Sequence, residues 1–163
     1  TPTPTPITTA FEVHGFTLKL DPDSDFVASG LDVTGFTETE ADESQGLLKL
    51  NYNGADVVLY WQPSASDVEP QQSVANAFGL LSSSKPSSIF TAINEGDLVV
   101  DGQDGRFGGF VSSDVSGGGS AGGLIGAWDC KTTSTSFTLT VSGPDSTVIQ
   151  IRFDRLVENF TCG

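Results

Sequence analysis

The sequence predicts an α+β fold in which two helices pack on an antiparallel β-sheet, and three patterns along its 163 residues support this class. Several segments alternate apolar and polar residues with the period of a half-buried strand. The pair Asn53-Gly54 separates two such segments, and an Asn-Gly pair in that position is the strongest short-range hairpin signal. Two other segments repeat apolar residues with a helical period. Hairpins combined with one internal and one terminal helix indicate an α+β sandwich.

The expected strands follow one another mostly as hairpins. One hairpin is centred on Asn53-Gly54, and a second is expected across a Gly/Asp turn near residue 102. The expected strands are 11–20, 32–40, 46–52, 55–61, 97–101, 105–111, 124–130 and 136–141.

The internal helix is expected between Val68 and Pro86. Pro70 suits the first turn of a helix, and Val74, Phe78 and Leu81 recur at helical spacing. The helix should end before Pro86, because the residue that precedes a proline resists the α conformation.

The terminal helix is predicted from an apolar stripe near the end of the chain. Asp145 or Ser146 is available as its N-terminal cap. The spacing i, i+4, i+7, i+8, i+11 is followed by Ile149, Phe153, Leu156, Val157 and Phe160.

Composition limits the partners. The 21 Asp and Glu residues against 7 Lys and Arg give a net charge of -14 and a pI of about 4.1. Nucleic acids and anionic membrane surfaces need a basic protein surface, so both are excluded as direct partners. Cationic ligands, Ca²⁺ and neutral surfaces remain open. The length predicts a single α+β domain over residues 11–163, preceded by a Thr/Pro-rich tether over residues 1–10.

Several features indicate an exported chain. The alternating Thr-Pro segment 1–6 favours an extended spacer, with a plain disordered terminus as the alternative. The absence of Met suggests a processed product, and no run approaches the roughly 18 apolar residues that span a bilayer. Cys130 and Cys162 form an even count, which in an exported chain indicates one disulfide; two buried free thiols are the alternative. We therefore expect an extracytoplasmic location, secreted or anchored at the cell surface, without direct membrane insertion.

An acidic segment carries the metal-like spacing of the sequence. Asp21, Asp23 and Asp25 alternate, and Asp32 stands at the twelfth position, as in a Ca²⁺-binding loop. Phe26 occupies the position where such a loop requires glycine. A Ca²⁺ site is one interpretation, and an acidic turn that hydrogen-bonds its own backbone is the other. No other cofactor is predicted.

The aromatic pair Tyr60 and Trp61 is the candidate ligand-binding feature. The two side chains point to opposite faces of the expected strand, so one of them can be exposed for stacking on a sugar or peptide. Packing in the core is the alternative.

The glycine-rich run 117–123 is interpreted as a hairpin connection, with a ligand lid as the alternative. It contains the spacing G-x-S-x-G around Ser120, but a strand follows where a hydrolase requires a helix. His14 is the only histidine and precedes the serine. The catalytic interpretation is therefore disfavoured, and no catalytic residue is assigned.

The order of elements, together with two short motifs, resembles exported bacterial proteins of the PsbP/Mog1-like family, including lipoproteins of Chloroflexi type. The motifs are Gly126-Ala127-Trp128-Asp129-Cys130 and Asn159-Phe160-Thr161-Cys162. The resemblance covers about residues 11–162. It implies an α/β/α sandwich, a disulfide from Trp-x-Cys to Phe-x-Cys, and a mostly non-enzymatic accessory or binding role.

The leading functional hypothesis is a non-enzymatic extracytoplasmic domain, tethered to the cell surface, that binds a protein, glycan or small ligand. It would use the sheet face or a pocket under the glycine-rich run. The alternative is a structural subunit of an extracellular filament or surface layer that self-assembles, with Ca²⁺ bridging acidic faces. A hydrolase is the disfavoured third class.

Overall fold

The computed structural model describes residues 7–8, 16–20, 26–28, 46–52, 54–65 and 67–162. These residues form ten strands and two helices. In chain order they are β1 (Ile7–Thr8), β2 (Phe16–Leu20), β3 (Phe26–Ala28), β4 (Gly46–Tyr52), β5 (Ala55–Pro63), α1 (Pro70–Ser84), β6 (Ser88–Val100), β7 (Gln103–Asp114), β8 (Ser120–Cys130), β9 (Thr135–Gly143), α2 (Ser146–Glu158) and β10 (Phe160–Cys162).

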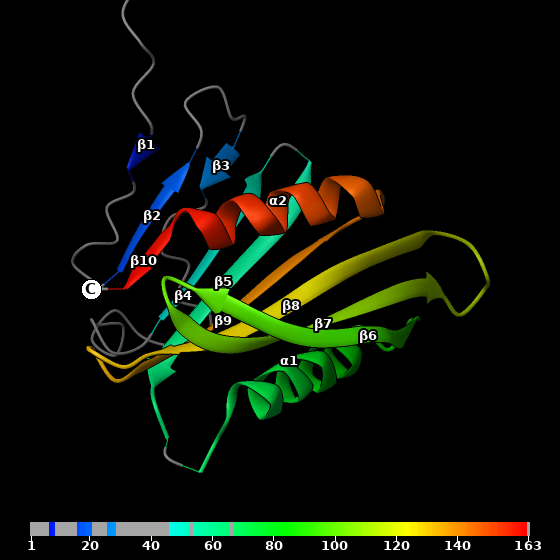
Figure 1. Ribbon diagram of the computed structural model, residues 1–163. Helices are drawn as coiled ribbons and strands as arrows, with labels where there is room; N and C mark the ends of the chain where they lie inside the picture. Colours follow the sequence, from blue (N-terminus) through cyan, green and yellow to red (C-terminus); the bar gives the residue numbers. More distant parts are fainter. Residues whose placement is uncertain are drawn as a thin grey trace, which may run out of the picture.

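Seven of these strands form one antiparallel sheet in the order β3-β4-β5-β9-β8-β7-β6, and β1-β2-β10 form a small second sheet. Helices α1 and α2 lie on opposite faces of the large sheet (Figure 1). The predicted α+β fold is confirmed. The hairpin at Asn53-Gly54 is confirmed as well, with β4 and β5 paired from Gly46 opposite Trp61 to Tyr52 opposite Ala55.

Helix α2 closes one face of the large sheet tightly. The Asp145 side chain caps its N-terminus by accepting hydrogen bonds from the backbone N–H groups of Thr147 and Val148, as predicted for one of the two candidate caps. The α2 residues Ile149, Phe153 and Leu156 are buried. Phe153 can approach β8 because residue 126 is glycine: a Cβ there would lie 2.8 Å from its ring.

An aromatic cluster fills the core on this same side. Strand β2 contributes Phe16, which contacts Trp61, Phe137 and Phe160, while Trp128 stacks on Phe137. All five rings are at most 3% exposed. The small sheet therefore completes the core that α2 covers.

The disulfide predicted between Cys130 and Cys162 is present, with its Cα atoms 5.7 Å apart. It joins the end of β8 to β10. The backbone N–H of Cys162 also donates a hydrogen bond of 2.9 Å to Asp101 in the β6–β7 turn. Three segments distant in the sequence are therefore fastened together at this end of the sheet.

Helix α1 covers the other face of the sheet, but its own side chains stay more exposed than those of α2. It contributes no buried residue, although Val74 and Phe78 face the sheet as the helical spacing predicted. Val74 approaches β7 at Gly108, where a Cβ would lie 3.0 Å from its Cγ1. The Phe78 ring meets the Phe110 ring edge-on at 6.2 Å. The two helices are thus unequally buried against the sheet.

Several expected boundaries were wrong. Strands β6 and β7 are longer than the expected 97–101 and 105–111, because β6 is an edge strand whose exposed residues do not alternate clearly. The glycine-rich run connects β7 to β8 as predicted, but β8 already begins at Ser120, since Gly123 accommodates the Phe110 ring. The last helix ends before Phe160, the final residue of its predicted apolar stripe. Phe160 belongs instead to β10, where it pairs with Leu18. The expected strand 32–40 and residues 11–15 lie outside the described residues.

Candidate binding cavity

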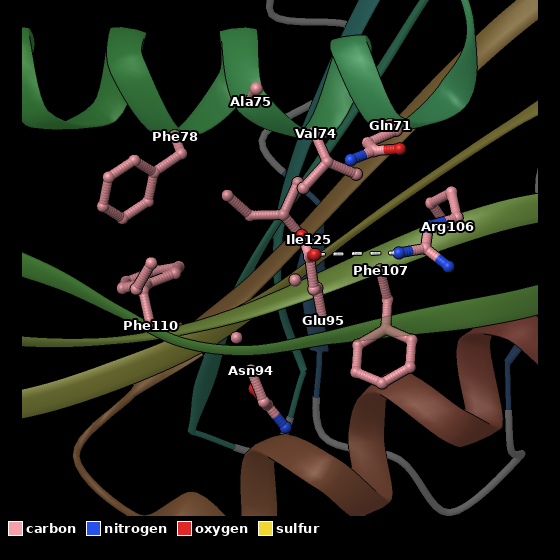
Figure 2. A pocket seen from close by; sticks show the side chains of 13 residues that line it. Gln71, Val74, Ala75, Phe78, Asn94, Glu95, Arg106, Phe107, Phe110 and Ile125 are labelled. Carbon is pink, nitrogen blue, oxygen red and sulfur yellow. Dashed lines mark ion pairs between the residues drawn. The ribbon is translucent and has the colours of Figure 1, made fainter.

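An open cavity of about 240 Å³ lies between α1 and the sheet (Figure 2). Its lining is mostly apolar. The lining residues come from α1, β6, β7 and β8, and they are Gln71, Val74, Ala75, Phe78, Ala92, Asn94, Glu95, Arg106, Phe107, Gly108, Gly109, Phe110 and Ile125.

Ring and side-chain contacts between α1 and β7 border the cavity. Phe78 packs on Phe110, and Phe110 is held from its other side by Phe90 at 5.8 Å. Val74 touches β7 at Gly108. Between these contacts α1 carries only the small side chain of Ala75, and the buried Ile125 of β8 forms part of the cavity wall.

Polar groups gather at one end of the cavity. The Arg106 guanidinium lies 2.6 Å from Asp97 and 3.9 Å from Glu95, so one cation faces two carboxylates. Figure 2 shows Arg106 beside Gln71 at this end, while Phe78 and Phe110 lie at the other. Arg106 is 29% exposed, whereas Glu95 and Asp97 are 67% and 91% exposed. Such exposed pairs contribute little to stability, which leaves these groups able to exchange partners.

The composition of the lining indicates what the cavity can hold. The lining offers an apolar body with one charged end, the usual composition of a ligand site. The lining residues include no hydroxyl, thiol or imidazole group that could act as a nucleophile. The cavity can therefore hold an apolar group whose neighbouring atoms are polar or positively charged.

A second hollow of about 310 Å³ lies beyond Phe110, which lines both spaces. Asp114, Gly119 and Gly122 bring the glycine-rich hairpin to its wall, so a pocket does lie beside this run. Its surface is more polar than that of the first cavity, with Asp56, Lys85 and several serines. It extends the open face toward the C-terminal end of α1.

Of the two predicted ligand-binding aromatics, Trp61 is fully buried against Phe16. It has no exposed surface, so it cannot form a stacking platform. Tyr60 is half-buried on the opposite face of β5, and its hydroxyl donates to Gln62 Oε1 at 2.9 Å. Burial raises the pKa of Tyr60 above its ordinary value. Ligand stacking on Tyr60 stays a prediction.

The predicted Ca²⁺ ligands Asp21, Asp23, Asp25 and Asp32 all lie outside the described residues, so that site stays a prediction. In the part of the chain that the structure describes, no three His, Cys, Asp or Glu side chains are grouped to hold a metal ion.

The residues of the hydrolase interpretation do not form a site in the described part of the chain. Ser120 is exposed at the start of strand β8, in the hairpin rather than before a helix, and His14 is outside the described residues.

The cavity itself was not predicted. Its residues Glu95, Arg106 and Ile125 belong to three different strands that only the tertiary fold brings together. One signal was available: α1 carries no charged side chain over its 15 residues, which is unusual for a helix with one face in water.

None of the described helices is long and apolar enough to cross a membrane. No protein-family model matches the chain, and no curated protein matches its sequence significantly.

Solved structures identify the fold. Cyanobacterial PsbP (CyanoP) of Synechocystis sp. is similar over 99% of this chain and 95% of its own, with a TM-score of 0.69 at 11% identity. The Ran-binding protein Mog1p of Saccharomyces cerevisiae is similar over 98% and 96%, with a TM-score of 0.59 at 10% identity. A mutant of the protein Mog1 gives a TM-score of 0.61 at 10% identity, over 97% of this chain and 96% of its own. The chain thus has the PsbP/Mog1-like fold, as the resemblance implied.

Proposed function

We propose that this chain is a non-enzymatic, extracytoplasmic binding domain that holds an apolar group of its partner in the cavity beneath α1. One observation carries the proposal: α2 buries three residues against the sheet, whereas α1 buries none and leaves an apolar cavity under it. Open apolar surface in a folded protein is retained where a partner covers it.

The binding free energy would come mainly from apolar burial. Val74 and Phe78 of α1 present partly exposed carbon surface, and removing such surface from water contributes about 25 cal/mol per Å². Arg106, Glu95 and Gln71 would orient the polar end of the bound group. Because the space is already formed, little reorganisation would oppose binding.

The structural neighbours are compatible with a binding role. One of them is, by its name, a Ran-binding protein, which is an example of protein recognition on this fold. At 10% identity no partner is transferred from it.

The proposed location rests on two features. A disulfide persists in oxidising compartments, and the Cys130–Cys162 bond joins β8 to β10 in this fold. The Thr-Pro segment has the composition of a spacer, so we propose that residues 1–10 tether the domain at the cell surface.

Replacing Ala92 with tryptophan should block the cavity. Ala92 lines the cavity from β6 and is exposed, so the larger ring can enter the space without displacing the core. The neutral dye N-phenyl-1-naphthylamine, whose fluorescence rises in apolar sites, serves as the probe. We expect Ala92→Trp to weaken dye binding roughly tenfold or more, since the occupied cavity loses its apolar contacts.

The matched control is Ala65→Trp, which makes the same change at an exposed loop residue outside the cavity lining. It should bind the dye as the wild type does, and both variants should keep the wild-type melting temperature. Equal dye binding by the two variants would contradict the proposed site.

A further inference from the structure

We propose that the partner is an extended polypeptide segment that adds a strand to β6, inserts one apolar side chain beneath α1 and places a basic side chain against Glu95 and Asp97. This inference rests on the proposed function and names the chemistry of its partner.

Strand β6 provides the edge for such pairing. It spans 13 residues at the end of the seven-stranded sheet, and its outer side pairs with no other described strand. It follows the border of the sheet (Figure 1). An edge strand presents unpaired N–H and C=O groups to which an extended peptide can add.

This same edge strand forms part of the cavity wall. Ala92, Asn94 and Glu95 belong to β6 and also line the cavity. A strand bound beside β6 would therefore pass the cavity mouth. Since successive side chains of a strand point to opposite faces, every second side chain of the peptide would face α1. One of these is placed to enter the space that Phe78 and Ile125 line.

The charges along β6 select a basic segment. Glu95 and Asp97 share the face of the sheet that carries Arg106, whose single positive charge leaves one carboxylate uncompensated. The whole chain carries -14, so acidic partners are repelled. A Lys or Arg side chain of the peptide opposite Asp97 would form an ion pair with the remaining carboxylate.

The same charges argue against a second copy of this chain on β6. In an edge-to-edge pair, Glu95 and Asp97 of one copy would face the same acidic strand of the other, which is unfavourable. The bulge between Ala92 and Asn94 also interrupts the regular register of β6.

An exposed apolar side chain on β6 adds one position to the pattern expected of the bound peptide. Val99 is 61% exposed on the face that carries Asp97. The partner pattern that fits the edge is therefore apolar, basic and apolar at alternate positions, opposite Val99, Asp97 and the cavity.

Fluorescein-labelled octapeptides with Val, Lys and Phe at alternate positions and Thr between them test this pattern by fluorescence anisotropy. Ala92→Trp should weaken binding roughly tenfold or more while Ala65→Trp leaves it unchanged, because only the first variant fills the cavity. Replacing the Lys of the peptide with Glu should weaken binding about tenfold. The double variant Glu95→Gln, Asp97→Asn of the protein should weaken binding of the original peptide by a similar factor.

Methylation of the peptide nitrogens separates strand addition from simple insertion of a side chain. Methyl groups on one alternate set of amides remove the hydrogen bonds to β6, whereas methyl groups on the other set point to solvent. We expect one set to abolish binding and the other to retain it. Equal binding of the two sets, or no peptide binding while the dye still binds, overturns strand addition and leaves the cavity site standing. Loss of the Ala92→Trp effect on the dye overturns the proposed function itself.

Discussion

Replacing Phe137 with alanine should lower the free energy of unfolding by about 3–5 kcal/mol, as expected for truncating a buried aromatic ring. Phe137 is 1% exposed. Its ring lies 5.2 Å from Phe16, 5.9 Å from Trp128 and 4.8 Å from Phe160, so the substitution leaves a cavity that three neighbours line. Urea unfolding followed by tryptophan fluorescence measures the change.

Phe90→Ala is the matched control on the opposite face of the sheet. Phe90 is half-buried and contacts Phe110. Its truncation should lower the unfolding free energy clearly less, because part of the ring is already in contact with water. Equal losses for the two variants would show that both faces are equally sealed and would contradict the asymmetry from which the binding site is argued.

Removing the disulfide should lower the free energy of unfolding by about 3–4 kcal/mol in the chain-entropy model. The bond closes a loop between residues 32 positions apart, and without it the unfolded chain gains conformational freedom. Replacing both Cys130 and Cys162 with alanine, with urea unfolding as the readout, measures this change. Alanine is preferred to serine because Cys130 is fully buried and a hydroxyl there would add an independent penalty.

The wild type treated with a reductant provides the control for that double variant. Both lack the covalent link, so both should lose stability; the alanine variant also lacks the buried sulfur of Cys130 and should be the less stable of the two by about 1 kcal/mol or less. A loss well below about 1 kcal/mol in both would mean that β2 and α2 already hold β10 in place without the bond.

The sequence predicted well those features that depend on local chemistry. The Asn53-Gly54 hairpin, the limits of α1 between Pro70 and Pro86 and the Asp145 cap of α2 all follow from residues close together in the chain. The even number of cysteines indicated the disulfide on a different ground, since Cys130 and Cys162 are 32 positions apart and only two cysteines are available to pair.

The sequence predicted poorly what depends on neighbours in space. Phe160 continues the helical apolar stripe, yet it pairs with Leu18 in β10, a partner distant in the chain. Trp61 and Tyr60 alternate along β5, but only the packing of Phe16 determines that Trp61 is the buried one. The order of strands in the sheet decides both outcomes.

The cavity belongs to this second group. Ala75 and Gly108 are inconspicuous in the sequence, and their small size matters only because α1 crosses β7 there. Likewise, Arg106 becomes the charged end of a site because β6 places Glu95 and Asp97 beside it. A helix without charged residues over a glycine-containing strand is the pattern that we would now examine first in similar sequences.

The central claim is that the open face beneath α1 is the binding face. Two-dimensional NMR of the labelled protein, titrated with N-phenyl-1-naphthylamine, tests it most directly. We predict that the signals of Val74, Ala75 and Ile125 shift together and saturate at one dye concentration, while Ile149 and Leu156 on the α2 side stay unchanged. Shifts confined to the α2 side, or centred on Tyr60 without those of the cavity residues, would contradict the account.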